Sequence, residues 1–572
     1  MKKPNADIRP YTKQFYRGNG FCLVLALVQT VLMTAGNLAI SWLIQQILDL
    51  VAGEKIAFTL SELIAIAVAC MAGVGAAFGC AYFSKPRFIS RAIGQYRNFV
   101  FGQISQKSIS AFNVENTGLY ISALSNDAAT IENGYLSNMF GLIDRSLMFV
   151  AALVMMFWYS PLLTLVSVGL SLLPISVSVL AGNRMAIAEK KVSDLNETYM
   201  STLRDSLAGF SVVKSFRAEL QMCRIYAESV RRVSDAKEKR KKISVIIQMF
   251  SAIAGIMVQL GVFFVGAYLA LSQKGITVGT VLVFVQLLNY VLAPIAEIPN
   301  YLAERRAAKA LIQKLANALH ENVREEGAAD KRFLTDGIRL QDVSFGYEDE
   351  KPVLHDVCFT FDSGKSYAIV GTSGSGKSTL LNLLMASHSG YTGSICYDDM
   401  ELRQISSESL YEMVSAVQQN VFIFNASIRD NITMFSDFPR EEVDRAIELS
   451  GLSQLLLERG EDSLCGENGS ELSGGEKQRI SIARSLLKKS RVLLVDEATA
   501  ALDARTAFQV SNAILDLDGL TRIVVTHALD EKLLKRYDCV LALRNGSLAE
   551  FGTFDDLMKE KGYFYSLFTV SQ

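Results

Sequence analysis

Six long apolar runs in the first 300 residues place the strongest limit on how this chain can fold. They cover approximately residues 20–50, 56–83, 137–159, 162–182, 243–271 and 277–299. A helix needs about 20 apolar residues to cross a bilayer, whereas core helices of soluble proteins are usually amphipathic. We therefore expect six transmembrane helices. The third and fourth are separated only by a tight turn, YSPLL at 159–163, where Pro161 breaks the helix.

The composition agrees with one apolar part and one soluble part. The chain has 572 residues, of which 50% are hydrophobic and 20% are charged, and a formal net charge of −1. A chain of this length should contain two or three domains, and a charge near zero gives no indication of a nucleic-acid partner. The eight cysteines are scattered without a CxxC pair. Free thiols in a reducing compartment are the expected state.

The distribution of basic residues predicts the orientation in the membrane. Lysine and arginine fill the long connections at 84–136 and 183–242, whereas the short loops on the other side offer only Lys55 and Lys274. By the positive-inside rule, the amino end, both long connections and everything after residue 300 are cytoplasmic. The long connections have a helical pattern and should extend the spans into the cytoplasm. We therefore divide the chain into a transmembrane domain with six helices and two long intracellular loops (1–313), a polar linker (314–336) and a soluble domain (337–572).

The soluble domain contains a phosphate-binding loop in the right context. An apolar strand, KSYAIV (365–370), leads into GTSGSGKST (371–379), and an apolar helix follows, LLNLLMA (380–386). Strand, G-x4-G-K-S and helix together predict a P-loop. Backbone N–H groups should wrap the phosphates, Lys377 should reach the β- and γ-phosphates, and Ser378 should ligate Mg²⁺. The predicted nucleotide-binding residues in this loop are Gly371, Thr372, Ser373, Gly374, Ser375, Gly376, Lys377, Ser378 and Thr379.

Two further strands end in residues suited to phosphate chemistry. The stretch RVLLVDEATAALD (491–503) brings Asp496, which could hold Mg²⁺, and Glu497, which could orient and deprotonate an attacking water. The stretch TRIVVTH (521–527) ends in His527, for which contact with the γ-phosphate is favoured over a purely structural role. For the other three histidines, His320, His355 and His388, a structural role is expected.

A second phosphate-facing loop lies at LSGGEKQR (472–479). Ser473 stands just ahead of a glycine pair, Gly474 and Gly475, that opens a helix. Such an opening presents a hydroxyl and free backbone N–H groups to an anion. The chain thus has two loops that could each hold a phosphate.

The order of these motifs resembles the nucleotide-binding domain of an ATP-binding cassette (ABC) transporter, and LSGGEKQR resembles its signature sequence. The resemblance implies that Tyr347 in VSFGY stacks on adenine and that Gln419 in VQQNVFIF senses Mg²⁺ and the membrane domain. It also implies that Asp503 is the aspartate of the D-loop, and that Glu467 lies in a loop that touches the partner's coupling helix. Glu476 departs from the pattern, because the signature more often has Gln there.

The resemblance also implies a dimer with shared sites. In this family two nucleotide-binding domains pair head to tail, so that each ATP lies between one chain's P-loop and the other chain's signature. Ser473, Gly474 and Gly475 would then bind a nucleotide held mainly by the partner. Both a homodimer and a heterodimer with a second half-transporter remain open, and the altered signature favours the heterodimer.

Over its whole length the chain is similar to a half-transporter of the exporter fold (type IV). The stretch 110–132 resembles the first intracellular loop, with a coupling helix near Ala111–Glu115. The stretch 203–219 resembles the second, with a short helix near Ser206–Phe210 that would dock on the partner. This implies a multi-pass protein of a cell membrane, bacterial inner or cytoplasmic, with the nucleotide-binding domain in the cytoplasm.

The sequence gives less information about the cargo than about the nucleotide site. Export of a small amphipathic molecule, a lipid or a peptide is the leading hypothesis. Uptake of a siderophore or other nutrient by the same fold is the first alternative, and an ATP-gated channel or regulator is an alternative of another class. Seven polar residues inside the spans either line a pathway or hydrogen-bond between helices: Asp144, Arg145, Gln248, Gln259, Gln286, Asn289 and Glu297.

Overall fold

The computed structural model of the chain divides into two compact units. It describes residues 6–54, 56–114, 117–272, 276–320, 327–347, 352–497 and 502–571. The first unit comprises Met1–Gly102 and Tyr120–Asn317, and the second comprises Gln103–Leu119 and Ala318–Gln572. All eight cysteines are free thiols, as predicted. Each unit is described by itself.

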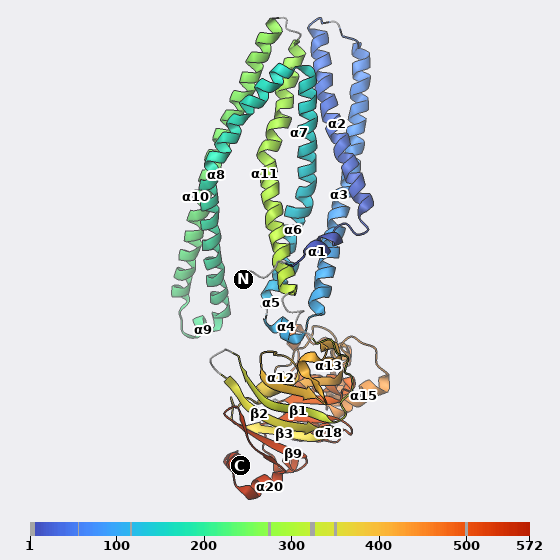
Figure 1. The fold of residues 1–572 in the computed structure, drawn as a ribbon, viewed down its shortest axis with the longest axis vertical. Coiled ribbons are helices and arrows are strands. Elements are labelled where there is room, and N and C mark those ends of the chain that lie inside the picture. Colours follow the sequence, from blue (N-terminus) through green and yellow to red (C-terminus); the bar gives the residue numbers. More distant parts are fainter. Residues whose placement is uncertain are drawn as a thin grey trace. The chain divides into compact units, whose positions relative to one another are not determined.

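Long helices make up the first unit (Figure 1). They are α2 (Gly20–Val51), α3 (Leu60–Ser105), α7 (Asn138–Tyr159), α8 (Pro161–Ala208), α10 (Glu219–Leu271) and α11 (Val278–His320). The shorter helices in and between the units are α1 (Arg9–Gln14), α4 (Ile109–Val114), α5 (Thr117–Leu124), α6 (Asn126–Ile131), the π-helix η1 (Glu132–Ser137) and α9 (Phe210–Ser215). Each predicted apolar run coincides with one of the long helices.

Among the described residues, five helical segments are long and apolar enough to span a membrane. They are α2, α3, the segment from Thr117 to Tyr159, α10 and α11. For α8 the structure gives only a shorter apolar stretch, Pro161–Pro174. A membrane-spanning helical domain is therefore confirmed, and the fourth of the six predicted spans remains a prediction.

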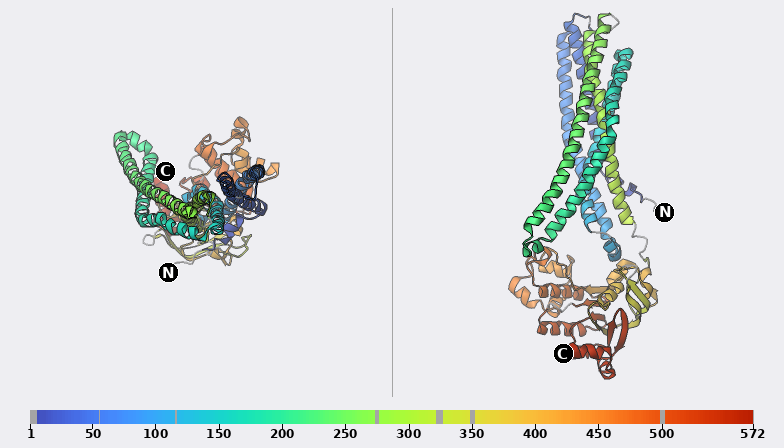
Figure 2. Two further views of the ribbon diagram at one scale, coloured as in Figure 1. Left: turned by 90° about the horizontal axis from the view of Figure 1, so that it is seen from above. Right: turned by 90° about the vertical axis from the view of Figure 1, so that its left-hand side faces the viewer.

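The long connections are continuations of these helices. α3 continues to Ser105, α8 to Ala208, and α10 begins at Glu219, well before its apolar part. Figures 1 and 2 show α8 and α10 side by side, with α9 joining their ends. The short helix was predicted near Ser206–Phe210 but begins at Phe210, because α8 continues through Ser206 and ends at its cap, Gly209.

A buried carboxylate links the ends of α2 and α11 in the first unit. Asp49 is 3% exposed. Its carboxylate accepts hydrogen bonds from the Gly279 N–H at 3.1 Å and from the Thr277 hydroxyl at 3.0 Å. A Cβ at position 279 would lie 2.5 Å from the Asp49 carboxylate and 2.8 Å from the Gln45 carbonyl oxygen, so a larger residue would have to displace these groups. Asp49 thereby satisfies an N–H at the start of α11 that has no partner within the helix.

Several of the polar residues predicted inside the spans pair between helices. The Arg145 guanidinium on α7 lies 2.7 Å from the Glu297 carboxylate on α11, and the Tyr301 hydroxyl also donates to Glu297. The Gln259 amide on α10 donates to Asn289 on α11 at 2.8 Å. For these four residues the structure therefore shows the inter-helix hydrogen bonding that was one of the two alternatives.

The second unit contains two sheets. The four-stranded sheet is antiparallel, in the order β2 (Pro352–Asp362), β1 (Gly337–Gly346), β4 (Thr392–Tyr397), β5 (Met400–Glu401). The six-stranded sheet has the order β10 (Ser547–Gly552), β9 (Cys539–Arg544), β3 (Ser366–Gly371), β8 (Thr521–Val525), β7 (Val492–Asp496), β6 (Val414–Val417). All neighbours in it are parallel except β10 with β9. The inner strands β3 and β7 are continuously buried, as parallel strands covered on both faces should be.

Helices accompany these sheets in the second unit. They are α12 (Lys377–Leu384), α13 (Ser407–Met413), α14 (Ile428–Thr433), α15 (Arg440–Leu449), α16 (Ser453–Arg459), α17 (Gly474–Lys488), α18 (Ala504–Leu515), α19 (Glu531–Leu534), α20 (Phe554–Glu560) and α21 (Tyr563–Ser571), with 3-10 turns at Leu402–Gln404 and Glu467–Gly469. One apolar core lies between the sheets and α12, with Phe361, Ile369 and Leu383 at its centre. A second core joins α14, α15 and α17.

The predicted first coupling helix belongs to this second unit. α4 covers Ile109–Val114, and Glu115 of the prediction lies outside the described residues. The Ile109 N–H donates to the Tyr411 hydroxyl at 3.0 Å, and the Lys107 ammonium donates to the Ala318 carbonyl at 2.7 Å. The start of α4 is thus held by the chain's own C-terminal unit.

A buried carboxylate, Asp398, holds the end of the linker just before β1. α11 runs to His320, inside the predicted linker, and β1 begins at Gly337. Asp398 accepts hydrogen bonds from the N–H groups of Thr335, Asp336 and Gly337 and from the Lys331 ammonium. Burial opposes the charge, but these donors lower the pKa of Asp398 well below its usual range.

We predict that Asp398→Asn destabilises this connection locally by about 2 kcal/mol, because hydrogen bonds to an ionised group contribute roughly 1.5–3 kcal/mol each and the amide replaces only part of them. Hydrogen exchange of the amides at 335–346 should become faster. Since the folded pKa is depressed, the difference from the parent is complete at pH 7 and shrinks as the pH falls below about 4.

The matched control is Asp399→Asn, at the neighbouring exposed carboxylate, which should leave exchange unchanged. Equal exchange rates in the two variants would contradict the role given to Asp398.

Candidate functional site

The carboxyl ends of β3, β7 and β8 lie side by side in the six-stranded sheet. Val525 on β8 pairs with Ile369 on β3 and with Asp496 on β7. Ligands of open parallel sheets bind outside the carboxyl ends of the strands. The P-loop leaves β3 at this edge, Glu497 follows β7, and His527 follows β8. The structure thus brings the three predicted motifs together.

Two glycines allow the P-loop its close turns. Gly376 has φ +98°, and a Cβ there would lie 2.6 Å from Leu354. A Cβ on Gly371 would lie 2.3 Å from the Leu543 carbonyl oxygen. Gly376 is also the residue before α12, and no side chain caps that helix. The first N–H groups of α12 therefore remain available to an anion.

Further donors converge on the same loop. The Lys377 ammonium donates to the carbonyls of Gly371 and Thr372, at 3.0 Å each. Burial lowers the pKa of Lys377, an effect that the nearby carboxylates of Glu497 and Asp496 oppose. Among the described residues the buried Ser375 hydroxyl has no hydrogen-bond partner. Because an unpaired buried hydroxyl is costly, this loop fits a phosphate.

Two of the three predicted Mg²⁺ ligands, Ser378 and Asp496, are adjacent, whereas the amide of the third, Gln419, donates to Glu497. The Ser378 hydroxyl donates to the Asp496 carboxylate at 3.0 Å. Burial raises the pKa of Asp496, while the hydrogen bond from Ser378 lowers it. No cluster of three or more His, Cys, Asp or Glu side chains that could hold a metal alone is present in the described part of the chain. This donor set fits Mg²⁺, which is commonly held by one or two protein oxygens together with water and substrate phosphates.

The three predicted catalytic side chains form one cluster around Glu497. One oxygen of its carboxylate lies 2.7 Å from His527 Nε2, and the other accepts from the Gln419 amide at 3.1 Å. The backbone of Glu497 has φ +50°, a left-handed conformation that strains a non-glycine residue and recurs at functional sites. The His527–Glu497 contact was not predicted from the sequence, which placed His527 toward the phosphate.

Tyr347 lies beside the P-loop with its ring exposed. Its hydroxyl lies 3.2 Å from the Thr379 hydroxyl, and 57% of the residue is accessible. The ring meets the edges of Phe345 and His388, with centroids at 5.1 and 5.3 Å. Burial lowers the pKa of His388, and its ring packs against those of Phe345 and Tyr347. That agrees with the structural role expected for it.

The second phosphate-facing loop is a capped helix N-terminus. Ser473 precedes α17, and its hydroxyl accepts from the Glu476 N–H at 3.3 Å. The Glu476 carboxylate in turn accepts from the Ser473 N–H at 2.6 Å, which completes a capping box. Burial raises the pKa of Glu476, but the hydrogen bonds with Ser473 and the nearby arginines outweigh this and lower it. Glu476, which stands where the signature more often has Gln, thus gives the helix a charged cap that the helix dipole stabilises.

Asp503 also caps a helix. Its carboxylate accepts from the Thr506 N–H at 3.0 Å, at the start of α18. Asp503 therefore has a structural role in the single chain, as the N-cap of α18. Residues 498–501, between Glu497 and this cap, lie outside the described part.

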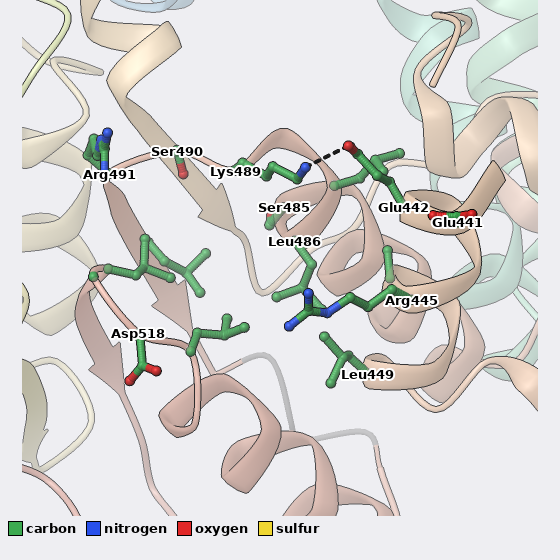
Figure 3. Close-up of a pocket in the computed structure, with 16 residues that line it drawn as sticks. Glu441, Glu442, Arg445, Leu449, Ser485, Leu486, Lys489, Ser490, Arg491 and Asp518 are labelled. Atoms are coloured by element: carbon green, nitrogen blue, oxygen red, sulfur yellow. Dashed lines mark ion pairs between the residues drawn. The ribbon is translucent and has the colours of Figure 1, made fainter. Parts of the chain in front are cut away.

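Of two cavities in the second unit, one lies away from this site and the other adjoins it. One of about 590 Å³ is lined by α15, the end of α17, the start of β7 and the turn at 517–520. Figure 3 shows Arg445 reaching into it and the Lys489–Glu442 ion pair at its rim. It contains none of the predicted nucleotide residues. The other, of about 400 Å³, adjoins the site, with Gly371, Thr372 and His527 facing Tyr563 and Val570 of α21.

Comparisons with known proteins agree with both units. The family model for the ABC transporter transmembrane region matches residues 23–295, and that for the ABC transporter matches residues 354–500. The chain is 27% identical over 502 residues to an ATP-dependent lipid A-core flippase of Syntrophus aciditrophicus, covering 86% of this chain and 82% of the relative. It is 27% identical over 560 residues to a protein of the same name from Photorhabdus laumondii, covering 95% and 94%.

A solved structure has a similar fold. It is that of a bacterial Atm1-family ABC exporter with ATP bound, with a TM-score of 0.83 and 24% sequence identity. The similarity covers 96% of this chain and 98% of the other. The helical unit and the sheet-containing unit thus occur together in one known architecture.

We predict that Lys377→Ala weakens binding of Mg-ATP by about 10- to 100-fold, because a hydrogen bond to a charged group contributes roughly 1.5–3 kcal/mol. Equilibrium binding of a fluorescent ATP analogue to the intact chain measures the effect. Lys365→Ala is the matched control, since Lys365 is an exposed lysine just before the opposite end of β3 that pairs with Asp362. Parent-like affinity in Lys377→Ala would remove the P-loop assignment.

Proposed function

Because the chain belongs to the ABC transporter family, as an exporter-type half-transporter with an ATPase coupled to transport, we propose that it works as a dimer that exports an amphipathic lipid or similar small molecule. The observation that carries the catalytic part is the cluster of Gln419, Glu497 and His527 beside the Ser378–Asp496 pair. This cluster stands next to the P-loop, where the phosphates of ATP would lie.

Each residue of the cluster has a distinct role in the proposal. Glu497 orients and deprotonates the attacking water, and Gln419 and His527 hold its carboxylate from both sides. General-base catalysis needs a positioned acceptor within hydrogen-bond reach of the water. Lys377 and the P-loop N–H groups bind the phosphates, Ser375 adds its unpaired hydroxyl, and Tyr347 offers its exposed ring to adenine.

Mg²⁺ completes the proposed site. Ser378, Asp496 and Gln419 would hold it, and it would neutralise charge on the phosphates of bound ATP. The adjacent Ser378 hydroxyl and Asp496 carboxylate support this assignment.

The signature serves the partner's nucleotide in this proposal. Ser473, Gly474 and Gly475 begin α17, whose N–H groups and dipole favour an anion. The Ser473 hydroxyl lies at this helix start, where it accepts a hydrogen bond from the Glu476 N–H. Asp503 lies near the partner in the same arrangement. The partner is either a second copy of this chain or a related half-transporter.

An exposed aromatic patch supports contact with a partner's membrane domain. Phe422, Phe424 and Phe435 stack edge to face with centroids at 5.1 and 5.5 Å, and Phe422 and Phe435 are each 59% exposed. The loop around α9 exposes apolar side chains of matching character, with Phe210 at 58% and Phe216 at 79%. We propose that the partner's α9 docks on this patch, near Glu467.

The cargo assignment rests on the relatives. Those named above are lipid A-core flippases of bacteria, which supports a lipid-like cargo and a location in the bacterial cytoplasmic membrane. Nutrient uptake and an ATP-gated channel remain the competing functions. Uptake would move cargo in the opposite direction, and a channel would not drive cargo against a gradient.

We predict that Glu497→Gln lowers the steady ATPase rate by about 10²–10⁴-fold, the usual contribution of a general base, while ATP still binds. In proteoliposomes, ATP-driven movement of a fluorescent lipid out of the cytoplasm-equivalent leaflet should stop as well. Glu531→Gln, an exposed glutamate on α19 that pairs with Lys535, should hydrolyse and transport like the parent.

Three results would contradict the proposal. Parent-like hydrolysis in Glu497→Gln would show that this residue is not the base. Lipid movement toward the opposite leaflet would indicate uptake. ATP-dependent movement that never exceeds equilibration would indicate a channel.

A further inference from the structure

Arg484 connects α17, which begins at the signature, to the segment that follows Gln419. It lies on α17, the helix that begins after Ser473. Its guanidinium donates to the Phe422 carbonyl at 2.7 Å, to the Asn431 carbonyl at 2.5 Å and to the Asn431 side-chain oxygen at 2.7 Å. Phe422 follows Gln419 by three residues. One side chain therefore links the signature helix to the segment that continues from Gln419.

Asn431 completes this connection from within the core. It is 0% exposed. Its amide donates to the carbonyls of Phe424 and Ser427, at 3.0 Å each, and its oxygen accepts from the Phe424 N–H at 2.9 Å. Because a satisfied buried network has few alternative arrangements, the segment at 422–424 is held in one position relative to α17.

The loop that precedes the signature is hydrogen-bonded to the segment before α14. The Cys465 N–H donates to the Ala426 carbonyl and the Ile428 N–H donates to the Ser463 carbonyl, both at 3.0 Å. The side chains of this region share one apolar core, which includes Ile423, Ile432, Cys465, Leu472, Ile480 and Ala483. Since packed cores deform little, a shift of the 422–424 segment must be followed by α17 and Ser473.

The other end of the connection is the hydrolytic cluster. Gln419 donates to Glu497, so a change around that carboxylate acts on the start of the same segment. We infer that Arg484 and Asn431 couple the chain's own hydrolytic site to the signature that it offers to its partner, which makes the two ATP sites of the dimer interdependent. This rests on the proposed function, in which the signature acts on the partner's nucleotide. Arg484 is a positioning residue, since its guanidinium contacts Phe422 and Asn431 rather than the P-loop or Glu497.

The geometry of the guanidinium makes the inference testable by a conservative change. Arg484 spans two main-chain carbonyls with a planar fork, whereas a lysine is a point charge that cannot reproduce this fork. Arg522 offers a matched control. It is 8% exposed and donates to the carbonyls of Leu515, Leu517 and Gly364, and these lie in neither the 422–431 segment nor α17.

The experiment compares Arg484→Lys and Arg522→Lys in the intact chain reconstituted in proteoliposomes. We expect the ATPase of Arg484→Lys to fall about tenfold, with the Hill coefficient for ATP dropping from near 2 toward 1, since cooperativity between two sites needs their coupling. ATP affinity of the P-loop, measured in a Glu497→Gln background, should stay within about twofold. Arg522→Lys should keep the parent's Hill coefficient even where its melting temperature falls.

A purely structural role for Arg484 would lower stability and leave the Hill coefficient unchanged, and that result would overturn the inference, as would a parent Hill coefficient of 1. Asn431→Ser provides a second variant if Arg484→Lys fails to fold, because it removes the bonds to Phe424 and spares the one from Arg484 to Phe422. Failure of the proposed function is seen separately: Ser473→Ala would then hydrolyse ATP at the parent rate. With Ser473→Ala inactive and Arg484→Lys unaltered, only the coupling is wrong.

Discussion

The parallel pairing of β3, β8 and β7 is the constraint on which the functional part of this protein depends. Each strand is a short buried apolar run, and each ends in residues that could not be placed in a core: the P-loop, Asp496 with Glu497, and His527. Because parallel neighbours end at the same edge, residues from three distant parts of the chain meet within hydrogen-bond distance. The burial that stabilises the strands also perturbs the pKa values of Lys377 and Asp496 at this edge.

The membrane unit follows a different constraint. Its helices satisfy their own backbone groups, as a bilayer requires, and they extend past the apolar runs to α4 and α9. The first of these short helices lies in the C-terminal unit of its own chain, whereas the second exposes apolar side chains. In the dimer that we propose, α9 contacts the partner through these side chains, and each nucleotide lies between one chain's P-loop and the other chain's signature.

Local patterns carried most of what could be predicted. The apolar runs, the P-loop and the strand ends each consist of contiguous residues, so the sequence alone predicts α2, α11 and the strands that lead into the P-loop and into Glu497. The Arg484–Asn431 network and the hydrogen bonds to Asp398 join residues far apart in sequence, and no local sequence pattern predicts them. The His527–Glu497 contact was missed for a related reason: the sequence places a residue at a strand end without telling which way its side chain turns. The start of α9 depended on how far α8 continued before Gly209.

The central claim is that each ATP site is shared between two chains, and a mixed dimer tests it most directly. Lys377→Ala chains and Ser473→Ala chains, carrying different tags, are co-expressed and the mixed dimer is purified through both tags. One site then contains both lesions and the other contains none. The account predicts that the mixed dimer occludes one nucleotide, on the Ser473→Ala chain, while dimers of either single variant occlude none. A mixed dimer that occludes no nucleotide, although it forms and remains folded, would contradict it.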